Sequence, residues 1–311
     1  MISKILQCNE RNENMEGYLT DIQRFSLNDG AGIRTTLFFK GCNMKCVWCH
    51  NPETINFKQD LMLFKNKCIG CGKCFGACPL NLHKIEDGKH TVDISRCRRC
   101  GKCVDVCYAQ ALKFSAIKMT ADQIEKEIAQ DIPYYNLSGG GVTFSGGEAL
   151  CQAEFVDELA QWCKQMGIHT AIETNMLHDF EKIEEVLKKM DLVMLDIKIF
   201  DDEKHKKYTG VSNRIILENV KKLDELNIPM IVRTPLIPKM TDDNENLKAI
   251  CDFVSKLKNL QYYELLNFNP LGISKYNSMF EKQEIVNERP LPKTRLDEIK
   301  NMLSGCKVKI S

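Results

Sequence analysis

Residues 33–50 read IRTTLFFKGCNMKCVWCH, and this stretch decides how the rest of the chain is interpreted. Its first part, residues 33–39, is rich in β-branched and aromatic side chains and is typical of a strand. Its second part carries Cys42, Cys46 and Cys49 at C-x3-C-x2-C spacing. The sequence therefore predicts a strand that ends in a loop of three cysteines.

This cysteine spacing indicates an iron–sulfur cluster. A [4Fe-4S] cluster is normally held by four thiolates, so a set of three leaves one iron open to a ligand that is not protein. The alternatives are a zinc site, buried structural thiols or a disulfide. Zinc normally takes four N or S ligands, and His50 is poorly placed as the fourth because it is adjacent to Cys49. The spacing resembles the signature of the radical S-adenosylmethionine (SAM) superfamily, which implies that SAM chelates the open iron.

Length and composition bound the architecture. The chain has 311 residues, 43% of them hydrophobic and 27% charged, with a formal net charge of +1. This suffices for one large α/β domain, or one domain with an insert, and argues against a nucleic-acid or membrane-surface partner held by bulk electrostatics. We find no apolar run of about 18 residues and no signal-peptide pattern. We therefore expect a cytoplasmic protein whose 16 cysteines are reduced and bind metal.

Strand-like and helix-like segments alternate along most of the chain. Helical patterns lie near 121–130, 152–166, 179–189, 214–226, 243–257 and 292–303, and short apolar runs lie near 142–145, 168–172, 192–195, 229–233 and 262–266. This order predicts parallel βαβ units. With the strand at 33–39 there are about six units, which favours an α/β fold, either a partial (β/α)6 TIM-like barrel or an open doubly wound sheet. In both folds, ligands bind beyond the carboxyl ends of the strands.

We expect the chain to be divided into three parts. Residues 1–16 are polar and irregular and are interpreted as a disordered or weakly docked extension. Residues 17–65 and 117–311 form the partial barrel, and residues 66–116 form a cysteine-rich insert.

The insert carries two further cysteine runs. Both follow C-x2-C-x2-C-x3-C: the first is Cys68, Cys71, Cys74 and Cys78, and the second is Cys97, Cys100, Cys103 and Cys107. The spacing matches the bacterial ferredoxin run, in which the fourth cysteine ligates the other run's cluster. We therefore assign one [4Fe-4S] cluster to Cys68, Cys71, Cys74 and Cys107, and another to Cys78, Cys97, Cys100 and Cys103. A pair of four-cysteine zinc sites is the alternative, but these favour two C-x2-C knuckles separated by a longer loop. Such an insert relays electrons or docks an electron donor or protein partner.

Polar motifs follow the later predicted strands. The segment GGGVTFSGGE at 139–148 ends a predicted strand with a glycine turn and the carboxylate of Glu148. The glycines let backbone approach a ligand, although an ordinary helix-start turn is the alternative. Asp196 and Lys198 lie two residues apart and share one side of a strand, so they suit a zwitterionic ligand unless they form a surface ion pair. Arg233 ends the next strand and could bind a carboxylate bidentately, with the same alternative.

Together these segments resemble one family within the superfamily. DGAGIRT at 29–35, CHNPE at 49–53, GGGVTFSGGE at 139–148 and VMLDIK at 193–198 are similar to the glycyl radical enzyme activating enzymes, the group containing pyruvate formate-lyase activase. The resemblance covers most of residues 17–305. It implies that SAM is cleaved reductively and that the resulting 5′-deoxyadenosyl radical takes a hydrogen from a glycine of a partner glycyl radical enzyme. It also implies a flavodoxin or ferredoxin as electron donor.

The resemblance further implies a set of site residues and cofactors. The cofactors are three [4Fe-4S] clusters, SAM and a monovalent cation, and no general acid or base is required. The residues implied around SAM are Trp48, Cys49, His50, Gly146, Gly147, Glu148, Asp196, Ile197, Lys198, Arg233 and Asn269. Those implied around the cation are Glu173, Thr174, Met194 and Asp196.

Two positions depart from the family pattern. Ala31 replaces the proline of the usual DGPG, and Asn269 replaces a histidine that lies near SAM in pyruvate formate-lyase activase. Asn269 can still donate or accept a hydrogen bond.

Two other functions are compatible with parts of the sequence. One is a different radical SAM enzyme that modifies a peptide, against which the ferredoxin-like insert argues. The other is a non-catalytic ferredoxin-like electron carrier, which would not cleave SAM.

Overall fold

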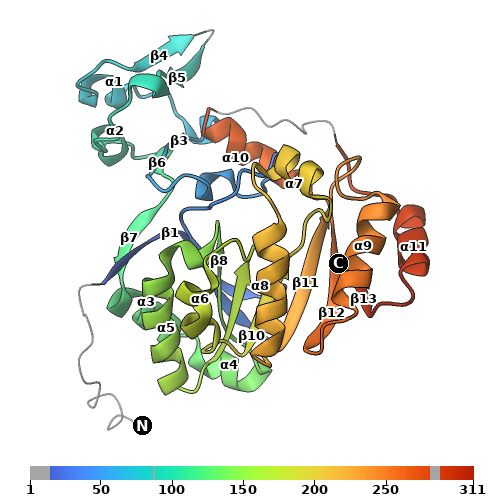
Figure 1. Cartoon of the computed structure of the whole chain (residues 1–311). Helices are drawn as coiled ribbons and strands as arrows, with labels where there is room; N and C mark the ends of the chain where they lie inside the picture. Colours follow the sequence, from blue (N-terminus) through green and yellow to red (C-terminus); the bar gives the residue numbers. More distant parts are fainter. Residues whose placement is uncertain (1–14, 87, 281–287) are drawn as a thin grey trace.

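The computed structural model describes residues 15–86, 88–280 and 288–311, and within this part of the chain nine strands form one sheet (Figure 1). The strand order is β13-β12-β11-β10-β9-β8-β2-β1-β7. Neighbours from β2 to β13 run parallel, whereas β1 and β7 extend the sheet antiparallel. The strands are β1 (Glu16–Ser26), β2 (Arg34–Phe39), β7 (Ile117–Thr120), β8 (Gly141–Gly146), β9 (His169–Thr174), β10 (Leu192–Asp196), β11 (Met230–Leu236), β12 (Leu260–Asn267) and β13 (Val308–Ile310).

Helices connect successive strands of the sheet from β7 to β13. They are α3 (Ala121–Ala129), α4 (Ile132–Ser138), α5 (Ala153–Gln165), α6 (Phe180–Leu187), α7 (Asp202–Thr209), α8 (Arg214–Glu225), α9 (Asn244–Val254), α10 (Ile273–Ser278) and α11 (Lys293–Met302). The apolar faces of α3, α5 and α6 join one core with the strands, to which Leu37, Phe39 and Phe144 contribute fully buried side chains. The prediction of an α/β fold with a mainly parallel sheet is therefore confirmed.

The register of the sheet explains why polar residues from distant segments meet. Phe39 at the end of β2 pairs with Gly146 at the end of β8, and Asp196 at the end of β10 pairs with Arg233 on β11. Parallel strands bring their carboxyl ends to one edge of the sheet. The cysteine loop, which follows β2, is therefore placed beside the segments that follow β8 and β9.

Residues 61–114 form a cysteine-rich lobe that projects from this edge (Figure 1). At its base, β3 (Leu61–Leu63) pairs antiparallel with β6 (Leu112–Phe114). The remaining elements are the strand pair β4 (His83–Glu86) and β5 (Lys89–Val92), and the short helices α1 (Lys73–Ala77) and α2 (Lys102–Asp105). A small core of aliphatic side chains packs against cysteines from both runs. The lobe therefore has a hydrophobic core separate from that of the sheet.

The structure contains elements that the sequence pattern did not predict. Helix α7 reads DEKHKKYT and has no apolar stripe, and β13 is a three-residue edge strand. The expected N-terminal extension lies outside the described residues up to residue 14, and Glu16 already begins β1. Among the described helices, none has the length and apolar character needed to cross a membrane.

Candidate functional site

A cavity of about 460 Å³ lies at the carboxyl edge of the sheet. It is lined by all three cysteines of the first loop and by most residues expected around SAM and the cation: Cys42, Cys46, Trp48, Cys49, His50, Gly146, Gly147, Glu148, Glu173, Thr174, Asp196, Lys198, Arg233 and Asn269. Ile197 and Met194 do not line it. Ile197 is buried in the main core, and Met194 packs with Ala171, Leu192 and Ile231.

The loop of three cysteines is held by backbone hydrogen bonds on both sides. Cys42 N–H donates to the carbonyl of Ile55 at 3.0 Å, and Lys45 N–H donates to the carbonyl of Thr209, at the end of α7, at 2.9 Å. The three thiols form no disulfide. Helix α7, which the sequence pattern did not reveal, therefore helps to fix this loop.

The three thiols fit the donor set of an iron–sulfur cluster. Burial raises the pKa of Cys42 and Cys46, and it raises that of Cys49 to about 12. Such thiols stay protonated unless a bound metal stabilises the thiolate. Cys42 Sγ accepts hydrogen bonds from Met44 N–H at 3.4 Å and from Asn175 Nδ2 at 3.9 Å. Donors of this kind stabilise metal-bound thiolates, so the residues fit three ligands of a [4Fe-4S] cluster.

Gly146 and Gly147 are required for packing of the protein backbone as well as lining the cavity. A Cβ on Gly146 would lie 2.2 Å from the backbone N of Phe39, and Gly146 has a φ of +112°. A Cβ on Gly147 would lie 2.4 Å from the carbonyl oxygen of Gly41. The glycines therefore let the end of β8 pack directly against the start of the cysteine loop, an explanation that the sequence did not suggest.

The carboxylate of Glu148 is buried and hydrogen-bonded to three protein donors. It accepts hydrogen bonds from Thr174 Oγ1 at 2.8 Å, from Asn175 N–H at 2.7 Å and from Leu150 N–H at 3.2 Å. Glu148 therefore joins the end of β8 to the end of β9 at the cavity wall. Asn175, which directly follows β9, is a site residue that the sequence did not predict.

Asp196 and Lys198 form an ion pair inside the cavity. Their Oδ2 and Nζ atoms are 2.6 Å apart, and the side chain of Lys198 is only 12% exposed. Burial would lower the pKa of Lys198, but the Asp196 carboxylate raises it above its ordinary value. This pair is therefore not a surface ion pair. It presents both of its charges to a ligand in the cavity.

Arg233 forms ion pairs with two protein carboxylates. Its Nε donates to Glu264 at 2.8 Å, and its Nη1 donates to Glu173, which also accepts from Ser145. Burial would lower the pKa of Arg233, but the two glutamates raise it. The guanidinium thus joins β9, β11 and β12, and its ion pairs are buried rather than at the surface.

Residues of the DGAGIRT run pack around the start of β2. Arg34 is fully buried; its Nε donates to Thr143 Oγ1 at 2.6 Å and its Nη2 to the carbonyl of Val142 at 2.6 Å. Asp29 lines the cavity and accepts a hydrogen bond from Thr36 at 2.7 Å. This run therefore ties the segment after β1 to the sheet, and Ala31 takes part through its carbonyl, 3.2 Å from Arg34 Nη1.

Asn269 lies at the exposed rim of the cavity. Its side-chain oxygen accepts a hydrogen bond from Leu271 N–H at 3.0 Å and caps a short 3-10 helix. Trp48, by contrast, is buried against Ile199, Ile237 and Phe268. The amide NH2 of Asn269 has no protein acceptor among the described residues.

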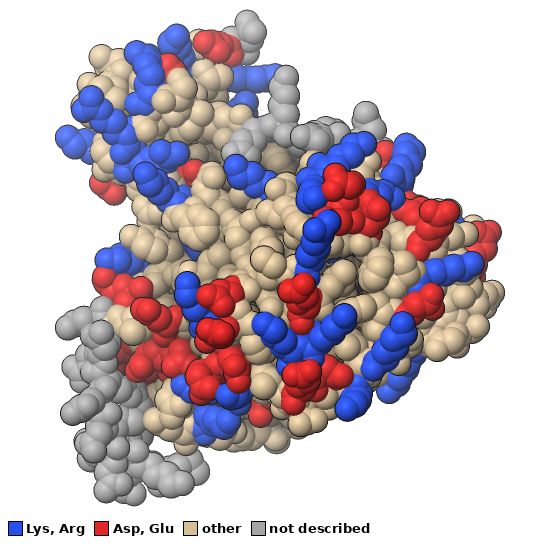
Figure 2. Space-filling model, viewed as in Figure 1, with Lys and Arg blue, Asp and Glu red and all other residues tan. Residues whose placement is uncertain are grey.

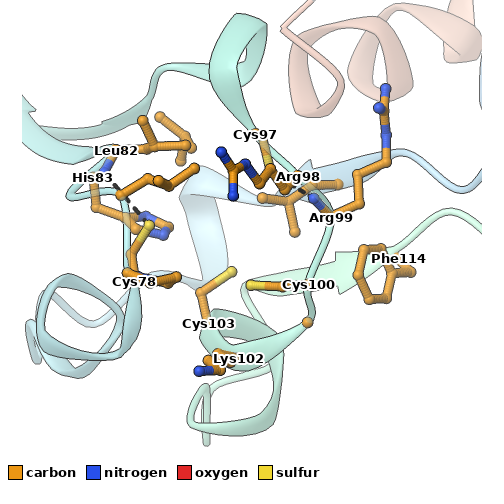
Figure 3. A pocket seen from close by; sticks show the side chains of 15 residues that line it. Cys78, Leu82, His83, Cys97, Arg98, Arg99, Cys100, Lys102, Cys103 and Phe114 are labelled. Carbon is orange, nitrogen blue, oxygen red and sulfur yellow. Dashed lines mark hydrogen bonds between the residues drawn. The ribbon is translucent and has the colours of Figure 1, made fainter.

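The cysteine-rich lobe contains two smaller cavities, each surrounded by four cysteines. One, of about 230 Å³, is lined by Cys78, Cys97, Cys100 and Cys103, whose sulfur atoms surround a common space in Figure 3. The other, of about 360 Å³, is lined by Cys68, Cys71, Cys74 and Cys107. Each cavity thus combines three cysteines of one run with the fourth of the other. That each holds a cluster stays a prediction.

Two buried histidines lie beside the second of these cavities. His83 Nδ1 and His90 Nε2 are 2.9 Å apart, and His90 Nδ1 is 3.6 Å from Cys68 Sγ. Burial lowers the pKa of both histidines, which favours neutral rings. Cys74, His83 and His90 also form a group close enough to hold a metal ion. The sequence spacing of the histidines, unlike that of the cysteines, gave no signal for this contact.

Comparisons with known proteins agree with one another. Residues 36–251 match the family model of the radical SAM superfamily. The chain is 41% identical over 278 residues to (2S)-3-sulfopropanediol dehydratase activating enzyme of Klebsiella oxytoca, covering 86% of this chain and 87% of that enzyme. It is 38% identical over 294 residues to trans-4-hydroxy-L-proline dehydratase activating enzyme of Clostridioides difficile, covering 94% and 97%. Streptococcus suis SuiB bound to precursor peptide SuiA is a structural neighbour at a TM-score of 0.52 and 13% identity, covering 87% of this chain and 46% of SuiB, a similarity of fold alone.

Proposed function

The chain belongs to the radical SAM superfamily and, within it, to the glycyl radical enzyme activating enzymes, and from that premise we propose that it generates a glycyl radical on a partner enzyme. The observation that most supports this proposal is that three free thiols share one cavity with the Asp196–Lys198 ion pair. This arrangement combines a metal-ligand set with a site for a zwitterion.

We infer that Cys42, Cys46 and Cys49 hold a [4Fe-4S] cluster and that SAM lies against the residues lining the cavity. When bound, these groups supply the radical chemistry: SAM is cleaved reductively to methionine and a 5′-deoxyadenosyl radical, which takes a hydrogen atom from a glycine of the partner. The protein's own residues supply position and exclude water.

Each charged residue has a separate task in this proposal. Lys198 and Asp196 offer opposite charges to the carboxylate and the ammonium of the methionine end of SAM. Glu148 holds β8 and β9 at the distance that the cavity requires. Arg233 remains paired with Glu173 and Glu264, so it stabilises the wall of the cavity.

The other SAM and cation contacts are proposals of the same kind. The remaining proposed SAM contacts that line the cavity are Trp48, Cys49, His50, Gly146, Gly147, Glu148, Arg233 and Asn269. Ile197 is proposed because it lies between Asp196 and Lys198. Glu173, Thr174, Met194 and Asp196 are proposed around a monovalent cation. The pairing of neighbouring strands supports this set, because Met194 on β10 lies opposite Glu173 on β9.

We also propose that the sheet is a partial (β/α)6 barrel and that the lobe is a ferredoxin-like insert with two [4Fe-4S] clusters. The support is the parallel order from β2 to β13 and the presence of four cysteines around each lobe cavity. A flavodoxin or ferredoxin would then supply the electrons.

The test is an anaerobic activation assay. Protein reconstituted with iron and sulfide is reduced with dithionite and mixed with SAM and a candidate partner, for example the dehydratases for which the relatives are named. We expect an EPR doublet from a glycyl radical, with a matching amount of 5′-deoxyadenosine. Deoxyadenosine without a doublet across all candidates would favour a different radical SAM enzyme. Neither signal from fully loaded protein would favour the electron carrier.

A further inference from the structure

The cysteine-rich lobe differs in charge from the rest of the chain. Residues 61–114 contain ten Lys and Arg and four Asp and Glu, a formal net charge of +6, whereas the whole chain carries +1. All ten basic residues are exposed, and Figure 2 shows Lys and Arg spread over the visible face of the lobe. Among the described residues, only Arg96 and Arg99 of these ten form an ion pair with a carboxylate. The lobe therefore presents a basic surface whose charge is largely unpaired within the chain.

One face of the lobe is also apolar. Ile69 is 71% exposed, Ile85 is 54% exposed and Tyr108 is 79% exposed. Ile69 and Ile85 line the same cavity as Cys71 and Lys73, and Lys73 Nζ lies 4.0 Å from the centre of the Tyr108 ring. These five residues define the Cys71 face. Exposed aromatic and aliphatic side chains within a charged rim are typical of a protein interface.

The other four-cysteine cavity, which we call the base cavity, lies at the base of the lobe, nearer the sheet. It is lined by Leu61 and Phe114, which belong to the base strands β3 and β6. Arg99 donates to Asp60 at 3.5 Å, and Asp60 pairs with Lys40 at 2.8 Å, directly before the loop of three cysteines. Each cavity has one exposed cysteine, Cys71 or Cys100, but only the first is surrounded by exposed apolar side chains.

We propose that the Cys71 face docks an acidic flavin-containing electron carrier of the flavodoxin type. This inference rests on the proposed function, which requires an external reductant. One electron leaves the reduced flavin and is taken up by the iron that Cys68, Cys71, Cys74 and Cys107 would hold, and no covalent bond forms or breaks between the proteins. The base cavity then lies between the entry point and the SAM cavity.

Charge complementarity favours an acidic partner, and the exposed apolar side chains favour one with an apolar cofactor edge. An acidic surface is attracted by the basic lobe, which accelerates encounter and makes binding dependent on salt. The apolar edge of a flavin suits Ile69, Ile85 and the ring of Tyr108, whereas the lysines suit the carboxylates that surround it. An acidic ferredoxin and the glycyl radical enzyme itself are the alternative occupants.

Binding can be measured without turnover. Oxidised flavodoxin is titrated by calorimetry into the oxidised, reconstituted protein at low and high ionic strength. The test variants are Lys73→Glu and Tyr108→Ser, and the matched control is Lys248→Glu, an exposed lysine of α9 without a carboxylate partner among the described residues. Iron content is checked first for every variant. We expect each test variant to weaken binding by about tenfold, the control to bind like the wild type, and high salt to weaken all of them.

Other outcomes overturn the inference. Equal binding by the Lys73→Glu variant and the wild type would remove the Cys71 face as the docking site. Competition by the glycyl radical enzyme for this face, or binding of an acidic ferredoxin in place of flavodoxin, would assign it to that other occupant. Dithionite needs no docking, so absence of dithionite-driven deoxyadenosine in the wild type would instead reject the proposed function, whatever flavodoxin does.

Discussion

At the scale of single residues, cysteines with similar spacing serve different predicted sites. Cys46 lines the proposed SAM cavity together with Lys198, whereas Cys71 is exposed on the lobe. We expect Cys46→Ala to abolish dithionite-driven SAM cleavage, because two thiolates do not hold the cluster in place. Cys71→Ala should leave the three-cysteine site assembled. Iron content, the EPR spectrum of the reduced protein and deoxyadenosine yield check both variants, and loss of SAM binding in Cys71→Ala alone would contradict the assignment.

His90 provides a second prediction at this scale. Its Nδ1 is 3.6 Å from Cys68 Sγ, and its Nε2 is 2.9 Å from His83 Nδ1. If His83 donates to His90, the Nδ1–H of His90 is free to donate to the sulfur. A hydrogen bond to a ligand sulfur raises the reduction potential of a cluster. We expect His90→Phe to lower the midpoint potential of one lobe cluster and to leave the others unchanged, which EPR-monitored redox titration measures. His169→Phe, far from the lobe on β9, is the control.

The candidate cluster ligands could be predicted from the sequence, because the spacing of the cysteines is itself typical of iron–sulfur sites. The cysteines that share each cavity follow from their intervals along the chain. The hydrogen bond from Asn175 to Cys42 and the proximity of His90 to Cys68 could not be predicted, because each joins residues that only the folded chain brings together.

At the scale of elements, the contact between β8 and the cysteine loop leaves no room for an added side chain. A methyl group at Gly147 would lie 2.4 Å from the carbonyl oxygen of Gly41, so backbone must shift. We expect Gly147→Ala to reduce iron bound at the three-cysteine site and to weaken SAM binding about tenfold or more. Gly305→Ala is the control, because a Cβ there has no atom within 4 Å. Iron analysis and SAM binding by calorimetry distinguish the two, and equal results would refute the packing argument.

Asp131 joins the first two strands to the helical layer. Its buried carboxylate accepts a hydrogen bond from Thr35 at 2.7 Å and from Arg24 Nε at 2.8 Å. Burial opposes the charged form, but these donors lower the pKa of Asp131 below its ordinary value. The contribution to stability is therefore present above about pH 4 and is lost as pH falls through the folded-state pKa.

This linkage predicts the behaviour of Asp131→Asn. We expect the substitution to lower the free energy of unfolding by about 1–3 kcal/mol at pH 7. The difference from the wild type should shrink between pH 7 and pH 3, because the contribution of the charged carboxylate is lost progressively below about pH 4. Urea unfolding of the cluster-free proteins at the two pH values measures this, and a difference independent of pH would contradict the role of the charge.

Strong periodicity determined which elements were predictable. The six predicted parallel strands correspond to β2, β8, β9, β10, β11 and β12, and the six predicted helices to α3, α5, α6, α8, α9 and α11. Helix α7 could not be predicted because its sequence is polar on every face, yet Thr209 at its end holds the cysteine loop. Tertiary contacts decided the conformation of that segment.

At the scale of the whole molecule, the lobe and the sheet meet at a polar neck. Lys40 Nζ is buried and donates to Asp60 at 2.8 Å and to the carbonyl of Glu53 at 2.5 Å. Asp60 also accepts from Arg99 of the lobe at 3.5 Å, and its backbone carbonyl accepts from Ser115 N–H at 2.8 Å. The neck thus joins the base of the lobe to the residue pair, Lys40 and Gly41, that leads into the cysteine loop.

Two substitutions at the neck should differ sharply in effect. Asp60→Asn leaves the Lys40 ammonium buried without a carboxylate, which costs about 3–5 kcal/mol. Arg99→Gln removes an exposed partner and costs at most about 1 kcal/mol. Because Lys40 precedes the cysteine loop, Asp60→Asn should also reduce iron at the three-cysteine site and increase hydrogen exchange at residues 56–60 and 115–117. Arg99→Gln should leave both nearly unchanged, and equal effects of the two would mean that the buried pair does not couple the lobe to the SAM cavity.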